Sequence, residues 1–156
     1  MIRKASIRDV RALHRLLSVH ADRGELLARP LSDIYDHLRD FSVFEEGPAG
    51  PVVGMCALHV CWEDLAEIRS LGVDEGRRHR GIGTALVNHA LAEARDLGVG
   101  RVFTLTYRPE FFGKLGFSEV DKASLPQKIW ADCIRCVKFP NCDEIAMLKT
   151  LEGSGI

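Results

Sequence analysis

The sequence lacks any long hydrophobic run. Its first residues, MIRKASIRDVRALHRLL, carry charges at almost every turn, whereas a signal peptide or a membrane span needs an unbroken apolar stretch. We therefore expect a cytoplasmic protein with no membrane partner. With 156 residues, 46% of them hydrophobic, the chain suits one domain with its own core better than two. We expect one domain over residues 1–151 and a disordered tail over 152–156.

The sequence also lacks an excess of charge of either sign. Lysine and arginine number 21 and aspartate and glutamate 22, which gives a formal net charge of -1. A chain without a strong overall field does not attract nucleic acid at long range. We expect no nucleic-acid partner, and any anion site must be local.

A disulfide framework is not expected, because the five cysteines are odd in number and no export signal precedes them. Cys56 and Cys61 lie in an apolar run and are expected in the core. Cys133, Cys136 and Cys142 have the spacing of a zinc knuckle, but no second Cys-x-x-Cys and no evident fourth ligand accompany them. Zinc binding, redox activity and reduced structural thiols all stay open for this cluster, as does a metal-dependent adaptor function.

Helical and strand patterns alternate along the chain. Ser6 and Asp9 match a capping box that begins a helix, and a second helix is expected from Ser32 because Ile34, Leu38 and Phe41 fall on one stripe. Later segments predict a hairpin over FSVFEE and VVGMCALHVCW, a strand over AEIRSLGV, a helix over ALVNHALAEARDLGV, a strand over RVFTLTY, a short helix from Pro109, and final strands over 117–120 and 144–151. This order indicates an α/β fold with a mixed sheet and helices on both faces.

A basic, glycine-bearing segment joins one predicted strand to the following helix. Arg78, Gly81 and Gly83 have the spacing Arg-x-x-Gly-x-Gly. Glycines let the backbone curve so that several N–H groups converge, and the helix adds its positive end to the same point. A pyrophosphate suits such a turn, although a solvated basic patch beside a loose helix start would have the same composition. The patterns of a dinucleotide-binding fold and of a P-loop are absent.

Three segments together resemble the GNAT superfamily of N-acetyltransferases, namely IRKASIRDVRAL, LGVDEGRRHRGIGTALVNHAL and FFGKLGF. The resemblance covers most of the chain and implies a mixed, mostly antiparallel sheet with acetyl-CoA as cosubstrate. It also implies that the strand holding Leu71 and Val73 splays from its neighbour to admit the pantetheine arm. The cofactor-binding positions that it implies are Leu71, Gly72, Val73, Arg78, His79, Arg80, Gly81, Ile82, Gly83, Thr84 and Phe112.

Acetyl transfer to an amine needs a base for the amine and a proton for the departing thiolate. The resemblance places Glu67 where many family members carry the base; the alternatives are an ordinary ion pair with Arg69 and a solvent-facing residue of the strand. The family's usual tyrosine acid is replaced here by Phe112. Tyr107 is the nearest phenol and our candidate acid, with a packed hydroxyl and direct protonation by solvent as alternatives.

Further segments, GELLARP, AEIRSLGV and LTYRPEFFGKLGFSEVDKASLPQKIW, are most similar to short bacterial N-acetylglutamate synthases. Glutamate carries two carboxylates, so its pocket should hold at least two cations. The candidates are Arg29, Arg69 and Lys128, each with a surface charge as its alternative. Acetylation of another small amine, and a non-catalytic acyl-CoA-binding module, are the competing functions. Members of the superfamily often pair, so a homodimer is possible.

Overall fold

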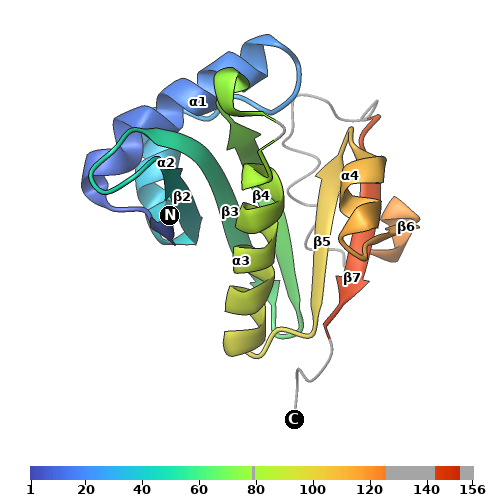
Figure 1. Cartoon of the computed structure of the whole chain (residues 1–156). Coiled ribbons are helices and arrows are strands. Elements are labelled where there is room, and N and C mark those ends of the chain that lie inside the picture. Colours follow the sequence, from blue (N-terminus) through green and yellow to red (C-terminus); the bar gives the residue numbers. More distant parts are fainter. Residues whose placement is uncertain (79, 126–142, 152–156) are drawn as a thin grey trace.

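The computed structural model describes residues 1–78, 80–125 and 143–151, and these residues form a seven-stranded sheet (Figure 1). The strand order is β1-β2-β3-β4-β5-β7-β6. The pairing of β4 with β5 is parallel, and the other neighbours pair antiparallel. The strands are β1 (Ile2–Lys4), β2 (Phe41–Glu45), β3 (Val52–Trp62), β4 (Leu65–Val73), β5 (Arg101–Thr106), β6 (Ser118–Val120) and β7 (Ile145–Thr150).

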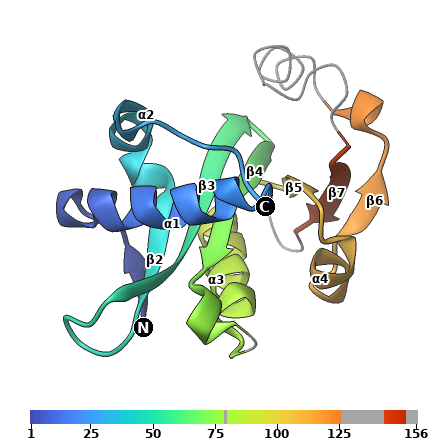
Figure 2. The ribbon, with the colours of Figure 1, turned by 90° about the horizontal axis from the view of Figure 1, so that it is seen from above.

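Helices cover both faces of this sheet, as the sequence predicts. The core on one face gathers residues of α3 and α4, and the core on the other face gathers residues of α1 and α2; Figure 2 shows α3 and α4 on one side and α2 on the other. The helices are α1 (Val10–Asp22), α2 (Leu31–Asp36), α3 (Ile82–Asp96) and α4 (Pro109–Lys114), with short 3-10 turns η1 (Ile7–Asp9), η2 (Leu38–Asp40), η3 (Glu75–Arg77) and η4 (Lys122–Ser124).

Predictions that depend only on residues close together in the sequence, such as the start of α1 and the end of α3, are confirmed. The Asp9 carboxylate accepts a hydrogen bond from the Ser6 N–H at 2.7 Å, which completes the predicted capping feature before α1. Gly98 follows α3 with a φ of +82°, the left-handed conformation that ends many helices. Cys56 is buried in the core as expected, and this burial raises the pKa of its thiol to about 12.

The prediction for the second helix is wrong about where the helix ends. Phe41 was expected on its apolar stripe, but η2 stops at Asp40 and Phe41 begins β2, where it pairs with Ala57 and is fully buried. Pairing with the neighbouring strand and burial in the core outweigh a short helical period. The helix itself begins at Leu31, one residue before the predicted start.

The sheet opens between its two parallel strands. β4 and β5 pair from Leu65 to Glu67, and among the described strands none pairs with the remainder of β4 along that edge. The Thr104 hydroxyl donates to the Ile68 carbonyl at 2.9 Å just where the strands part. A bulge follows in β4, where the register to β3 shifts and Ser70 has a φ of +57°. The two strands therefore diverge, which is the splay that the resemblance implies.

Candidate active site

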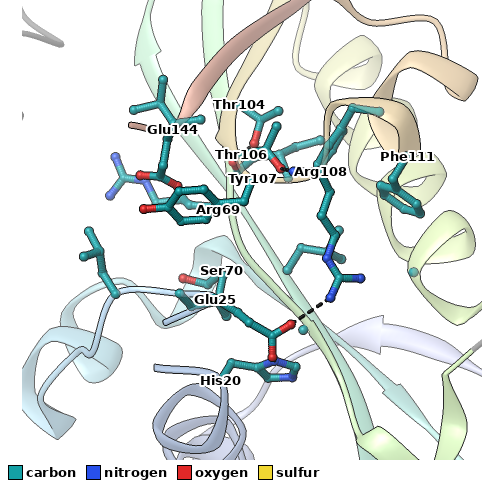
Figure 3. A pocket seen from close by; sticks show the side chains of 18 of the residues that line it. His20, Glu25, Arg69, Ser70, Thr104, Thr106, Tyr107, Arg108, Phe111 and Glu144 are labelled. Atoms are coloured by element: carbon teal, nitrogen blue, oxygen red, sulfur yellow. Dashed lines mark hydrogen bonds and ion pairs between the residues drawn. The ribbon is translucent and has the colours of Figure 1, made fainter. Parts of the chain in front are cut away.

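A cleft of about 1450 Å³ occupies the space between the diverging strands. Its walls come from β4, from the ends of α1 and β5, from the loop that precedes α2, from the turn before α3, and from α4. Figure 3 shows His20 and Glu25 on one side of this space, and Arg108 and Phe111 on the other. Segments far apart in the chain thus converge on one hollow, which is where ligands enter open sheets.

The turn before α3 has the geometry that the glycine spacing predicts. Gly81 has a φ of +78° and lies at the N-terminal cap of α3, a helix of 15 residues. Gly83 lies so close to α4 that an added Cβ would meet the Phe111 ring at 3.5 Å. An anion in the cleft would therefore face the positive end of α3 and its unpaired N–H groups. Most predicted cofactor positions of this turn line the cleft, namely Arg78, Gly81, Ile82, Gly83 and Thr84.

Two predicted residues of the turn differ from this pattern. Arg80 is not among the residues that line the cleft; its mostly exposed side chain lies 3.8 Å from Glu46. His79 lies outside the described residues. Among the described residues of the turn, Arg77 and Arg78 both line the cleft, and Arg77 is paired with Glu46 and Asp74.

The end of β4 lines the cleft through Leu71, Gly72 and Val73, three of the predicted cofactor positions. A side chain at Gly72 would approach the His20 ring to 2.9 Å, so only glycine fits beside α1. His20 Nε2 lies 3.1 Å from the Val73 carbonyl oxygen. The helix α1 is thus held against the strand that the pantetheine arm is expected to follow.

Glu25 joins three basic side chains across the cleft. Its carboxylate accepts hydrogen bonds from Arg78 at 3.1 Å and from Arg108 at 2.7 Å, and His20 Nδ1 lies 3.3 Å away. Figure 3 shows the contact between Glu25 and Arg108. Burial raises the pKa of Glu25, but the hydrogen bond and charge of Arg78, and then His20, outweigh burial and lower it overall. Glu25 is therefore ionised at neutral pH, and Arg78 must exchange this partner to reach a phosphate.

Glu67 and Arg69 lie next to each other on the α1 side of β4. Arg69 Nε donates to Glu67 Oε1 at 3.0 Å, so the predicted ion pair is present. The Glu67 side chain is 15% exposed and lines the cleft. A general base needs access to its substrate and is helped by partial burial, and Glu67 has both. The ion pair with Arg69 is also what a purely structural role for Glu67 predicts.

Arg29 reaches the same region from the loop before α2. Its Nε donates to Asp33, its Nη1 donates to the Ser70 hydroxyl at 3.1 Å, and its guanidinium lies 5.2 Å from the Phe41 ring centre. Burial raises the pKa of Asp33, but the hydrogen bond and charge of Arg29, with His37 and Arg69, lower it overall. Two predicted acceptor cations, Arg29 and Arg69, thus act on one carboxylate. The third, Lys128, lies outside the described residues.

The candidate acid is already hydrogen bonded. The Tyr107 hydroxyl donates to Asp143 Oδ1 at 2.7 Å, so its proton is directed to a carboxylate in this structure. Tyr107 lines the cleft and is partly exposed. Phe112, predicted to contact the cofactor, reaches the cleft wall but is only 4% exposed and packs edge-on against Phe111 and Phe117. Phe112 mainly builds the core.

Sequence reasoning missed Glu25, His20 and the pair Asp40–His59, whose Oδ2 and Nδ1 lie 2.7 Å apart. Glu25 lies in the connector between the first two helices, four residues before Arg29. Its nearness to that predicted site residue was the one signal in the sequence that could have identified it. The other residues gave no signal, because their neighbours in space are 19 to 53 residues away along the chain.

No metal centre is present in the described part of the chain, where no group of three or more His, Cys, Asp or Glu side chains is arranged to hold an ion. The cysteines considered for zinc, Cys133, Cys136 and Cys142, lie outside this part. None of the described helices has the length and hydrophobicity that a membrane-spanning segment needs.

The family model described as "Acetyltransferase (GNAT) family" matches residues 10–117. An uncharacterized N-acetyltransferase of Chlorobaculum tepidum is 44% identical over 150 residues, 96% of either chain. An amino-acid acetyltransferase of Mycobacterium tuberculosis is 38% identical over 136 residues, 86% of this chain and 78% of that protein. The amino-acid acetyltransferase of Neisseria meningitidis serogroup A is 31% identical, but this chain spans only 29% of its length.

Solved structures agree with these relatives. A Mycobacterium tuberculosis protein crystallised in complex with CoA and NLQ has a TM-score of 0.85 and 34% identity, with 97% of this chain and 99% of that chain covered. N-acetylglutamate synthase of Neisseria gonorrhoeae, complexed with coenzyme A and N-acetyl-glutamate, has a TM-score of 0.88 and 26% identity over 97% of this chain and 35% of that chain. The expected fold is confirmed.

Proposed function

Because the chain belongs to the acetyltransferase (GNAT) family and is thus an acetyl-CoA-dependent N-acetyltransferase, we propose that its acceptor is the α-amine of L-glutamate. The product would be N-acetylglutamate, which serves arginine biosynthesis. The observation that carries this proposal is that Arg29, Arg69 and Glu67 line one cleft, with Arg69 bonded to Glu67. The amino-acid acetyltransferases among the relatives, and a structural neighbour that holds N-acetyl-glutamate, support the choice of acceptor.

The cleft offers a natural path for the cosubstrate. The diphosphate would lie at the N-terminus of α3, against the N–H groups of residues 81–84 and the guanidinium of Arg78. The pantetheine arm would follow the unpaired edge of β4 toward Glu67. The thioester would then lie in the part of the cleft where the strands part.

The two arginines suit a substrate with two carboxylates. A guanidinium has five N–H donors in a planar fork, and the contacts of Arg29 with Asp33 and Ser70 use two of them while fixing its position. Arg29 would bind one substrate carboxylate and Arg69 the other. Lys128, predicted from the sequence, is a further proposed contact.

Glu67 would then remove a proton from the substrate ammonium, which leaves the neutral amine to attack the thioester. Arg69 holds the Glu67 carboxylate in place between turnovers. Tyr107 is the proposed acid for the thiolate, and it would have to release Asp143 to serve in this role.

A crystal structure with CoA and N-acetyl-L-glutamate tests this arrangement. We expect the diphosphate at residues 81–84, the acetyl group within reach of Glu67, and the two product carboxylates on Arg29 and Arg69. A product that binds with its carboxylates away from both arginines would contradict the proposed acceptor, even if CoA occupies the expected path.

A further inference from the structure

Acetylation of an ammonium releases a proton that the acceptor pocket must dispose of. The nitrogen loses two protons when the ammonium becomes an amide, the departing thiolate takes up one, and the other leaves to solvent. A base that accepts this proton must return it to water before the next turnover. A partly buried carboxylate such as Glu67 therefore benefits from a neighbour that accepts protons and leads outward.

His59 is such a neighbour. It lies directly opposite Glu67 in the antiparallel register of β3 and β4, and opposed residues in antiparallel strands project from the same face with Cβ atoms about 5 Å apart. Both residues line the cleft. The imidazole therefore lies on the same wall as the proposed base.

A carboxylate orients this imidazole. His59 Nδ1 lies 2.7 Å from Asp40 Oδ2, and an aspartate on one ring nitrogen leaves the other nitrogen to accept a proton. This is the arrangement by which a histidine accepts a proton from one group and passes it to another. Neither residue has a part in the proposed binding of acetyl-CoA.

A second cavity of about 460 Å³ lies behind the pair. His37, Asp40 and His59 line it, and the His37 ring lies 5.5 Å from the His59 ring in an edge-on contact. The exposed fraction of the side chain rises from 15% at Glu67 to 27% at His59 and 33% at His37. The path from cleft to cavity thus leads toward water.

We propose that His59, oriented by Asp40, takes the proton from Glu67 and releases it to the water of the second cavity beside His37. In this step the protonated Glu67 carboxyl returns to carboxylate while neutral imidazole becomes imidazolium, and the imidazolium then loses its proton to water. His59 acts through Glu67, so it is a positioning and relay residue, and its role rests on the proposed base role of Glu67. The titratable and charged groups that line these two cavities with it are His20, Glu25, Arg29, Asp33, Tyr35, Asp36, His37, Arg39, Asp40, Glu67, Arg69, Arg77, Arg78, Tyr107, Arg108, Lys122 and Glu144.

The competing explanation is structural, since the Asp40–His59 pair also ties η2 to β3. A purely structural pair would affect folding, or affect activity equally at every pH. A relay would affect turnover most where water and hydroxide are poor proton acceptors. The two explanations therefore differ in the pH profile and in rescue by a small base.

The test compares His59→Gln and Asp40→Asn with wild type by thiol release, using whichever amine wild type acetylates best. For His59→Gln we expect kcat to fall by about tenfold or more near pH 7, by roughly threefold or less above pH 9, and to recover with added imidazole. The KM for acetyl-CoA should not change. Asp40→Asn should show a smaller loss of the same kind. His14→Gln, which removes a histidine of α1 that does not line either cavity, is the matched control.

The proposal is overturned if folded His59→Gln keeps the wild-type kcat, or loses activity equally at all pH values without imidazole rescue. It is overturned as well if Glu67→Gln is as active as wild type, because the proton then takes another path. If His59→Gln does not fold, as judged by circular dichroism and CoA calorimetry, Asp40→Asn and His59→Asn decide by the same criteria. Wild-type preference for an amine other than glutamate would contradict the proposed acceptor and leave this test intact.

Discussion

Glu67 combines partial burial with an ion pair to Arg69 and a position where the two parallel strands part. These properties keep the carboxylate fixed and give it access to the cleft. We expect Glu67→Gln to lower kcat for amine acetylation by about 10²-fold or more, in the range of a lost general base. Thiol release at saturating substrates measures this, and calorimetry should find an unchanged affinity for CoA.

A plain structural role for Glu67 predicts the opposite combination. The variant would then lose stability or CoA affinity while its folded fraction kept a kcat near that of wild type. Glu63→Gln, in the turn between β3 and β4, makes the same chemical change at a residue that does not line the cleft and should leave both quantities unchanged.

Arg29 is held by Asp33 and by the Ser70 hydroxyl, and its side chain is only 11% exposed. A lysine at this position cannot form the planar, two-pronged contact that a guanidinium makes with a carboxylate. For Arg29→Lys we expect the KM for glutamate to rise by about tenfold, with the KM for acetyl-CoA unchanged. Arg23→Lys, at a residue paired with Glu75 outside the cleft lining, is the control. A change in the acetyl-CoA KM alone would argue against a role in acceptor binding.

At the scale of elements, the turn before α3 depends on the left-handed backbone of Gly81. An added Cβ meets no atom within 4 Å there, so the cost of a side chain is conformational and not steric. We expect Gly81→Ala to lower the free energy of unfolding by about 1 kcal/mol and to weaken CoA binding. Urea denaturation and calorimetry measure the two effects.

Gly76→Ala is the matched control for this change. Gly76 also has open space around its Cα but no left-handed φ, so alanine should be tolerated there. Equal effects of the two substitutions would contradict the assignment of a strained, preorganised turn at Gly81.

A second contact between elements is the ion pair of Arg3 in β1 with Asp9 in η1. Asp9 is buried, and its carboxylate accepts a hydrogen bond from the Arg3 guanidinium at 2.8 Å. This hydrogen bond, opposed by burial and supported by hydrogen bonds from Ser6, lowers the pKa of Asp9 from 3.8 to about 2. A carboxyl with a lowered pKa in the folded state stabilises the fold above its unfolded pKa, and the contribution is lost as pH falls through the folded pKa. We expect Asp9→Asn to cost about 2 kcal/mol of unfolding free energy at pH 7.

The difference between wild type and Asp9→Asn should stay constant down to about pH 5 and vanish as the pH approaches 2. Unfolding in urea at a series of pH values measures it. Asp22→Asn, at the exposed end of α1, should show neither the loss nor the pH dependence. A difference that persists unchanged at the lowest pH would contradict an ionic origin.

Elements whose signals are local were predictable from the sequence. The capping residues Ser6 and Asp9, the ending at Gly98 and the proline at the start of α4 depend on residues within one or two turns. Phe41 was misassigned because its strand partner Ala57 lies far along the chain. Long-range pairing decides such positions, and no local pattern reports it.

At the scale of the whole molecule, the turn before α3 was predictable because glycine spacing carries its own physical reason. The Glu25 contacts with Arg78 and Arg108 were not, because they link residues 53 and 83 positions apart. The same holds for the Asp40–His59 pair. The sequence therefore predicts the cofactor-binding turn of the cleft well. It does not predict which charged side chains of the cleft contact one another.

The whole molecule is proposed to bring acetyl-CoA and L-glutamate together across the gap between β4 and β5. A competition assay tests this most directly. Wild-type protein receives limiting acetyl-CoA together with equal concentrations of L-glutamate, L-aspartate, L-glutamine, glycine and L-lysine. The acetylated products are then quantified by mass spectrometry. Product ratios equal the ratios of kcat/KM. We expect N-acetylglutamate to exceed the products of glutamine, glycine and lysine by about tenfold or more, because these acceptors have no second carboxylate for the second arginine. A mixture in which glutamate is acetylated no better than glycine or glutamine would contradict the account.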